Sequence, residues 1–166
     1  AGDRVTKTNM SPEGKYPVYG AGNVPTGSLD RWNHERSLIF SRAGAGAGFV
    51  NFIEGRFWAT DVCFVATELD AGPLIKFVYY WMKSNERDLM KRTYGGSLPK
   101  IDKQYLWNHP VPVPPLPIQE EIVRILDHFN SLVNDLSVGL PAEIAARRKQ
   151  FEYYRDKLLT FGEKAA

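Results

Sequence analysis

SLIFSRAGAGAGFVNF, residues 37–52, sets three glycines between two apolar runs, and this spacing decides how the first half of the chain is interpreted. Glycine-rich loops that cradle a dinucleotide or S-adenosylmethionine lead into a helix, whose N-terminus faces the ligand. Here Phe49 stands where a dinucleotide fingerprint has its last glycine, no Walker lysine follows, and FVNFIEG alternates as a strand does. The stretch therefore predicts a tight strand-to-strand connection whose glycines allow positive φ and close backbone approach.

Outward from this hairpin, the chain up to Pro117 consists of short β-branched or aromatic runs bounded by Gly, Pro or Asn. The runs predicted as strands are YPVYG (16–20), SLIFSR (37–42), GFVNFIEG (48–55), RFWATDVCFVAT (56–67) and HPVPVP (109–114). One helix interrupts them at about residues 71–91, with apolar residues at helical spacing: Leu74, Phe77, Val78, Trp81, Met82 and Leu89.

After Pro117 the pattern changes to that of amphipathic helices. A first helix, residues 119–137, carries an apolar stripe at steps of four and three: Ile122, Leu126, Phe129, Val133 and Leu136. VGLP (138–141) separates it from a second helix, 141–159, whose stripe is Ile144, Phe151, Tyr154 and Leu158. Whether the two helices are collinear or fold back at VGLP stays open. Short helices with one apolar stripe are marginal alone, so this region needs a partner surface.

The predicted fold class is α+β, with a compact β-rich domain over residues 1–117 and one internal helix. Residues 118–166 form a long helical, coiled-coil-like arm. With 43% hydrophobic and 24% charged residues, the 166-residue chain is a folded globular protein. It contains no apolar run of the roughly 20 residues that span a membrane, and its single cysteine, Cys63, suits the core and a reducing cytosol.

Candidate catalytic chemistry is sparse. His34, His109 and His128 lie far apart with no metal-ligand spacing, and no serine occupies a nucleophile elbow. PVPPLP (112–117) lacks the polar and aromatic neighbours of an amino-methyltransferase motif and is interpreted as a rigid connector. We predict no catalytic residue, no metal and no cofactor.

A basic cluster stands out although the net charge is only +2. In RDLMKRTYGGSLPKIDK (87–103), five Lys and Arg residues face only Asp88 and Asp102. Two glycines beside a tyrosine make a flexible loop that offers amides, a ring and cations to phosphates and groove edges. The alternative is an ordinary solvated loop.

Several phrases occur together in order: YPVYGAGNVPTG, SLIFSRAGAGAGFVNF, FWATDVCFV, YGGSLPKIDKQYL, VPVPPLPIQEEIVRILDHF and AEIAARRKQFEYYRDKLLTF. Together they resemble one target-recognition domain and one helical region of the DNA-specificity subunit of type I restriction–modification enzymes. The resemblance covers nearly the whole chain.

The resemblance implies a non-catalytic, cytoplasmic prokaryotic protein. In such a subunit two recognition domains read the halves of a split target in double-stranded DNA, and two antiparallel helices act as the spacer. The subunit recruits two adenine-N6 methyltransferase subunits and, in the full complex, an ATP-dependent restriction subunit. This sequence has one unit and begins inside the recognition domain, which leaves open a natural half-subunit or a shortened product. A half-subunit is expected to self-associate through the helical arm.

For DNA contact we predict the basic loop together with cations of the hairpin: Arg36, Arg42, Lys91, Arg92, Thr93, Tyr94, Ser97 and Lys100. Alternatively, Arg42 forms a salt bridge beside the turn. For the glycines of the hairpin two partners stay open, a DNA backbone and the domain's own core. Two other functions stay open. One is the recognition fragment of a fused DNA methyltransferase, and the other is an assembly module that binds the methyltransferase through its arm.

Overall fold

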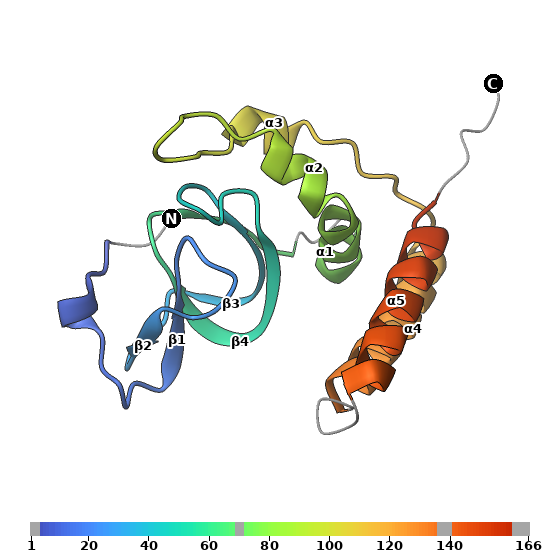
Figure 1. Ribbon diagram of the computed structural model, residues 1–166, viewed down its shortest axis with the longest axis horizontal. Coiled ribbons are helices and arrows are strands. Elements are labelled where there is room, and N and C mark those ends of the chain that lie inside the picture. Colours follow the sequence, from blue (N-terminus) through green and yellow to red (C-terminus); the bar gives the residue numbers. More distant parts are fainter. Residues whose placement is uncertain (1–3, 69–71, 136–140, 161–166) are drawn as a thin grey trace. The chain divides into compact units, whose positions relative to one another are not determined.

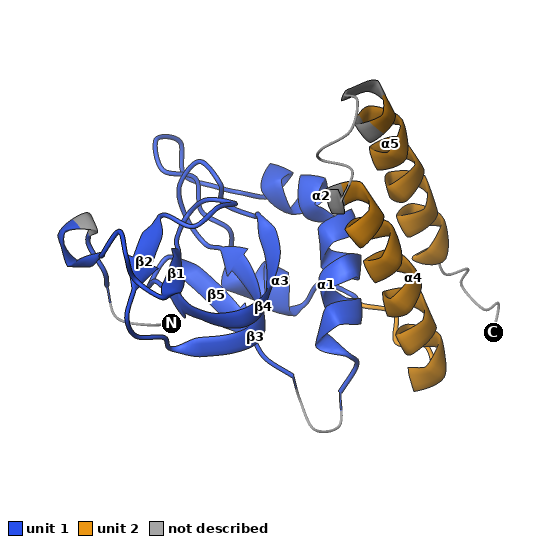
Figure 2. Cartoon of the chain, turned by 90° about the horizontal axis from the view of Figure 1, so that it is seen from below, with its two compact units in different colours: residues 1–110 blue, residues 111–166 orange. Residues whose placement is uncertain are grey.

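The computed structural model describes residues 4–68, 72–135 and 141–160 (Figure 1). The chain divides into two compact units, residues 1–110 and 111–166 (Figure 2). In the first unit a short 3₁₀ turn, Lys7–Asn9, precedes a five-stranded sheet of order β2-β1-β4-β3-β5. Its strands are β1 (Tyr16–Tyr19), β2 (Gly27–Leu29), β3 (His34–Ser41), β4 (Val50–Ala59) and β5 (Cys63–Ala66). Only the β1–β4 pairing is parallel.

The hairpin around the glycines is confirmed: β3 and β4 pair antiparallel from Phe40↔Val50 to His34↔Phe57. Beyond Gly55 the prediction of two separate strands is wrong, because β4 continues unbroken to Ala59. The expected strand at 109–114 is also wrong, since no strand forms there and its prolines lack the N–H groups a ladder needs.

Helix α1 (Ile75–Ser84) packs on β3 and β4 and buries its apolar face, including Phe77 and Tyr80. The single helix expected at 71–91 is divided, because Asn85 ends α1 and a separate helix, α2 (Glu86–Lys91), follows. A third short helix, α3 (Lys103–Trp107), was not predicted from the sequence.

An ion pair anchors the α1–α2 break to the start of β4. The Glu86 carboxylate accepts the Val50 N–H at 2.8 Å, and the Lys83 ammonium donates to the Val50 carbonyl at 3.0 Å. Lys83 and Glu86 also bond each other at 2.6 Å, and both are largely shielded from solvent. Both the N–H and the carbonyl group of Val50 thereby have hydrogen-bond partners outside the sheet.

The glycines of the hairpin loop approach the protein's own backbone and side chains. A Cβ on Gly46 would lie 2.1 Å from the carbonyl oxygen of Ala21. Gly48 has φ +94°, and a Cβ there would lie 3.0 Å from the backbone of Met90 in α2. Of the two partners that the sequence left open for these glycines, the structure shows the domain's own core.

The second unit contains α4 (Leu116–Asp135) and α5 (Pro141–Leu158), which lie side by side. The rings of Phe129 and Tyr154 stack at 5.4 Å, so the two helices fold back and are not collinear. The long coiled-coil arm expected from the sequence is therefore not confirmed. None of the described helices combines the length and the apolar composition needed to cross a membrane.

The residues of the two predicted apolar stripes differ in how deeply they are buried. Ile122 and Leu126 are buried, whereas Tyr154 keeps 37% of its surface exposed. The partly buried members are Phe129, Val133, Phe151 and Leu158. Leu136 and the side chain of Ile144 lie outside the described residues.

Candidate nucleic-acid interface

The basic loop of the sequence forms a small hairpin. Tyr94 and Lys100 exchange two backbone hydrogen bonds, both 2.8 Å long, and Gly95 makes the turn at φ +88°. Tyr94 and Leu98 are more than half exposed, at 57% and 52%. We call residues 94–100 the recognition hairpin, and Figure 1 shows it as the open loop beside α3.

The base of the recognition hairpin is joined to the glycine-rich loop after β3. The Ile101 N–H donates to the Arg42 carbonyl, and the Gly44 N–H donates to the Pro99 carbonyl, each at 2.9 Å. These bonds bring Arg42 next to Lys100, although more than fifty residues separate them in the sequence.

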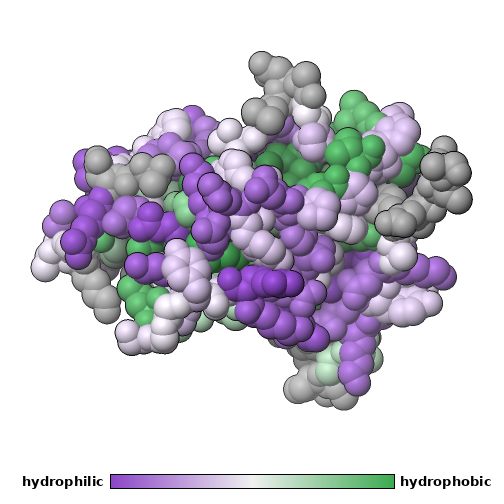
Figure 3. Space-filling model, turned by 90° about the horizontal axis from the view of Figure 1, so that it is seen from above, coloured by the Kyte–Doolittle hydropathy of each residue, from purple (hydrophilic) through white to green (hydrophobic). Residues whose placement is uncertain are grey.

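A hollow of about 440 Å³ opens at this junction. It is lined by Arg42, Phe64, Tyr94, Lys100, Ile101, Asp102 and Lys103. Within the described ranges, no carboxylate forms an ion pair with Arg42, Lys100 or Lys103. Figure 3 looks from above at the face that carries the recognition hairpin in Figure 1, where hydrophilic residues surround smaller apolar patches.

Aromatic rings support the cations of the hollow. The Arg42 guanidinium lies 5.9 Å from the Phe64 ring centre, and the Lys103 ammonium lies 5.4 Å from that of Trp107. Phe64 and Trp107 themselves meet edge to face at 5.7 Å. Such contacts fix the direction of long side chains while their charged ends stay in water.

The other predicted residues of the loop have different surroundings. Arg92 lies over the Tyr105 ring, and Lys91 pairs with Asp88 at 2.9 Å, a bond that lowers the pKa of that carboxyl group. The Thr93 hydroxyl donates to the Met90 carbonyl at 2.9 Å, which is a structural bond. Ser97 is exposed in the turn of the recognition hairpin.

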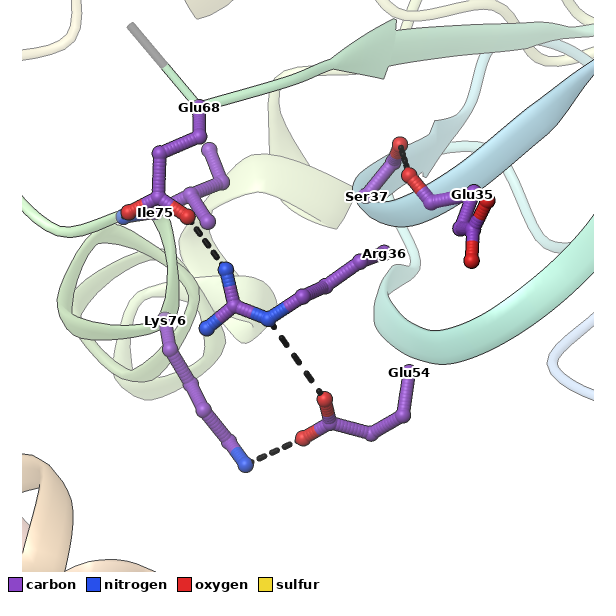
Figure 4. Close-up of polar contacts among 7 residues, drawn as sticks. All are labelled: Glu35, Arg36, Ser37, Glu54, Glu68, Ile75 and Lys76. Atoms are coloured by element: carbon purple, nitrogen blue, oxygen red, sulfur yellow. Dashed lines mark hydrogen bonds and ion pairs between the residues drawn. The ribbon is translucent and has the colours of Figure 1, made fainter. Parts of the chain in front are cut away.

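Arg36 lies apart from the hollow, toward the opposite end of β3. It sits in a bulge at φ +38° and pairs with Glu54 and Glu68 (Figure 4). Glu54 also binds Lys76, and Glu68 accepts the Ile75 N–H at the start of α1. Arg36 therefore joins β3, β4 and α1 within the domain, which satisfies its charge internally.

Sequence reasoning missed Lys103, Phe64 and Trp107 as members of the site. Lys103 was already visible in the basic cluster, but its position beside the hollow depends on α3. That short helix begins because the Asp102 carboxylate accepts the Tyr105 N–H at 3.0 Å. Phe64 and Trp107 carried no local signal, since their role depends on long-range packing.

The cysteine is buried, and His34 and His109 are partly buried. Burial raises the pKa of the Cys63 thiol to about 11, and its sulfur lies 3.3 Å from the Gly20 carbonyl oxygen. Partial burial also lowers the pKa of His34 and of His109. Across residues 4–68, 72–135 and 141–160, no group of three His, Cys, Asp or Glu side chains is arranged to hold a metal ion.

Lys and Arg side chains clustered around one exposed loop are the electrostatic footprint of nucleic-acid binding. Comparison with known families agrees: residues 1–146 match the family described as the type I restriction modification DNA specificity domain, and the chain belongs to it.

Among curated proteins, the chain is 42% identical over 90 residues to the EcoR124I/EcoR124II specificity subunit of Escherichia coli, covering 53% of this chain and 22% of that protein. It is 31% identical over 164 residues to the MpnII specificity subunit of Mycoplasma pneumoniae, covering 96% and 49%. The chain thus spans about half the length of such relatives, or less.

Solved structures show the same fold. The S subunit from M. genitalium matches with a TM-score of 0.67 at 23% identity, over 82% of this chain and 37% of that one. The HsdS subunit from Thermoanaerobacter tengcongensis matches with a TM-score of 0.57 at 20% identity, over 95% and 41%.

Proposed function

We propose that this chain is one DNA-recognising unit of a type I specificity subunit, which reads one half of a split target and catalyses no reaction itself. The observation that carries the proposal is the convergence of Arg42, Lys100 and Lys103 on one hollow below an exposed hairpin. Phosphate contacts supply affinity and position, and side chains of the hairpin discriminate bases at about 1–3 kcal/mol per good contact.

The proposed DNA surface comprises the hollow and the loop around it. Its members are Arg42, Lys91, Arg92, Thr93, Tyr94, Ser97, Lys100 and Lys103. Arg36 is left out, because two carboxylates already pair with its guanidinium. Thr93 belongs to the surface as a support, since its hydroxyl holds the loop to α2.

In the same proposal, residues 118–166 form the spacer and assembly region, and residues 1–117 form the recognition domain. The helices pair with those of a second unit, supplied by the same polypeptide or by another copy, so that two half-sites are read together. The same region recruits the adenine-N6 methyltransferase subunits, and the restriction subunit joins the full complex. Tyr153, 60% exposed, offers contact area that the buried Ile122 and Leu126 do not.

The test is DNA retention by the full chain, alone and with an adenine-N6 methyltransferase subunit present, followed by selection of the bound sequences. Enrichment of one half-site motif is expected. The charge reversals Lys91→Glu and Arg92→Glu are expected to weaken retention, and unchanged affinity in both would remove the loop from the surface.

Two further measurements separate the alternatives. Calorimetry that shows S-adenosylmethionine binding to the chain alone would favour a methyltransferase fragment. Retention of the methyltransferase subunit without any DNA binding would favour a pure assembly module. Sedimentation of the free chain tests pairing, and a monomer at high micromolar concentration would contradict self-association.

A further inference from the structure

We propose that the hollow lined by Arg42, Lys100 and Lys103 is a clamp for one phosphodiester group, which sets the position of the recognition hairpin on the DNA. The proposal rests on the DNA-binding function proposed above and assigns phosphate binding and base discrimination to different residues. The hollow reads no base, and the exposed turn of the hairpin, with Ser97 and Leu98, contributes the sequence discrimination.

The charge of the hollow favours an anion. Three cations line it against one carboxylate, that of Asp102. This carboxylate is engaged, because it accepts the Tyr105 N–H at 3.0 Å and so caps α3. Like charges gathered at one opening repel each other, and a bound phosphate relieves this repulsion.

The geometry of the hollow is prepared before DNA arrives. Arg42 and Lys100 lie on backbone segments joined by the Ile101–Arg42 and Gly44–Pro99 hydrogen bonds. The rings of Phe64 and Trp107 hold the side chains of Arg42 and Lys103. Cations that are already oriented lose less conformational entropy when they bind, so more of the electrostatic attraction appears as affinity.

The lining of the hollow favours a backbone group over a free nucleotide. A volume of about 440 Å³ accommodates a phosphate with the sugars on either side. A nucleotide site would also need polar groups that bond a base edge or a ribose. The only carboxylate of this lining, Asp102, is committed to its helix.

The experiment combines Lys103→Gln with DNA in which single phosphates of the selected target are replaced, one at a time, by neutral methylphosphonates. Wild-type chain is expected to lose affinity when one particular phosphate is neutralised, whereas Lys103→Gln should be less sensitive at that position alone, since Arg42 and Lys100 still line the hollow. The slope of log affinity against log salt should become shallower by about 0.9 for the variant, which is about 3.5-fold less loss between 50 and 200 mM salt. The ratio of specific to non-specific affinity should not change.

Lys15→Gln is the matched control. Lys15 is an exposed lysine next to β1, which lies toward the opposite edge of the sheet from β5. Lys15→Gln should keep the wild-type methylphosphonate profile. Lys103→Arg, which keeps the positive charge in the hollow, should keep it as well. Tryptophan fluorescence melts confirm that each variant is folded.

Three outcomes would overturn the clamp while leaving DNA recognition intact. They are a Lys103→Gln profile identical to wild type, a changed base preference, or micromolar binding of a free nucleotide by the wild-type chain. Absence of DNA binding by the wild type, with and without methyltransferase subunits, would instead remove the proposed function itself.

Discussion

Gly48→Ala tests directly why the hairpin loop contains glycine. Gly48 has φ +94°, and the new methyl group would lie 3.0 Å from the Cα and N atoms of Met90. Met90 cannot move aside easily, because it belongs to α2 and its neighbour Leu89 is fully buried. The substitution therefore combines backbone strain with overpacking.

The expected cost follows from these two effects. A left-handed backbone costs an L-residue about 1–2 kcal/mol, and overpacking adds about 1–3 kcal/mol. We expect the free energy of unfolding of the first unit to fall by about 2–5 kcal/mol. For a domain of roughly this size, that corresponds to a decrease in Tm on the order of 10 °C or more.

Urea and thermal unfolding followed by tryptophan fluorescence measure the effect. All four tryptophans lie between residues 32 and 107, so the signal reports the first unit alone. Gly55→Ala is the control, because a Cβ there meets nothing within 4 Å. Its unfolding free energy should stay within about 0.5 kcal/mol of wild type.

A Gly48→Ala protein as stable as Gly55→Ala, but weakened in DNA binding, would refute this reasoning. The glycine would then serve approach to DNA and not packing against Met90.

Two further predictions concern groups that the fold buries. Glu86→Gln should lower the free energy of unfolding by about 1–2 kcal/mol in urea titrations, because the largely shielded Lys83 ammonium loses its carboxylate and keeps only the Val50 carbonyl. Asp88→Asn, which breaks the exposed pair with Lys91, should have no measurable effect, and equal losses in both variants would contradict this account. Burial raises the pKa of the Cys63 thiol from 9.0 to about 11. The protonated thiol therefore makes its full contribution to the free energy of unfolding below pH 9, and this contribution is lost as pH rises toward 11. Unfolding free energies should therefore show wild type losing about 2–3 kcal/mol relative to Cys63→Ala across that range, and a pH-independent difference would refute the burial effect.

Local patterns predicted the elements that are long and periodic. The short apolar run SLIFSR and the alternation in FVNFIEG specified the β3–β4 hairpin, and the apolar spacing after Pro117 specified α4. The short elements β2 and α3 were missed, because three to five residues are too few to show a period. The single helix predicted at 71–91 is divided at Asn85, on either side of which Lys83 and Glu86 bond the backbone of Val50.

Local charge density likewise indicated the loop that holds Tyr94 and Lys100, but it could not distinguish Arg42 from Arg36. Both are arginines of the same hairpin region, yet one faces the hollow and the other is paired with Glu54 and Glu68. The difference depends on which end of β3 each residue occupies and on which segments pack there.

By itself, then, the sequence determined the α+β class, the hairpin at the glycines, the helical C-terminal region and the family. All of these depend on the order and spacing of neighbouring residues. Only the tertiary structure decided that the glycines serve the domain's own packing, that α4 and α5 fold back, and that Lys103, Phe64 and Trp107 join Arg42. These features are contacts between segments far apart in the chain, and their energies depend on distances that no local pattern encodes.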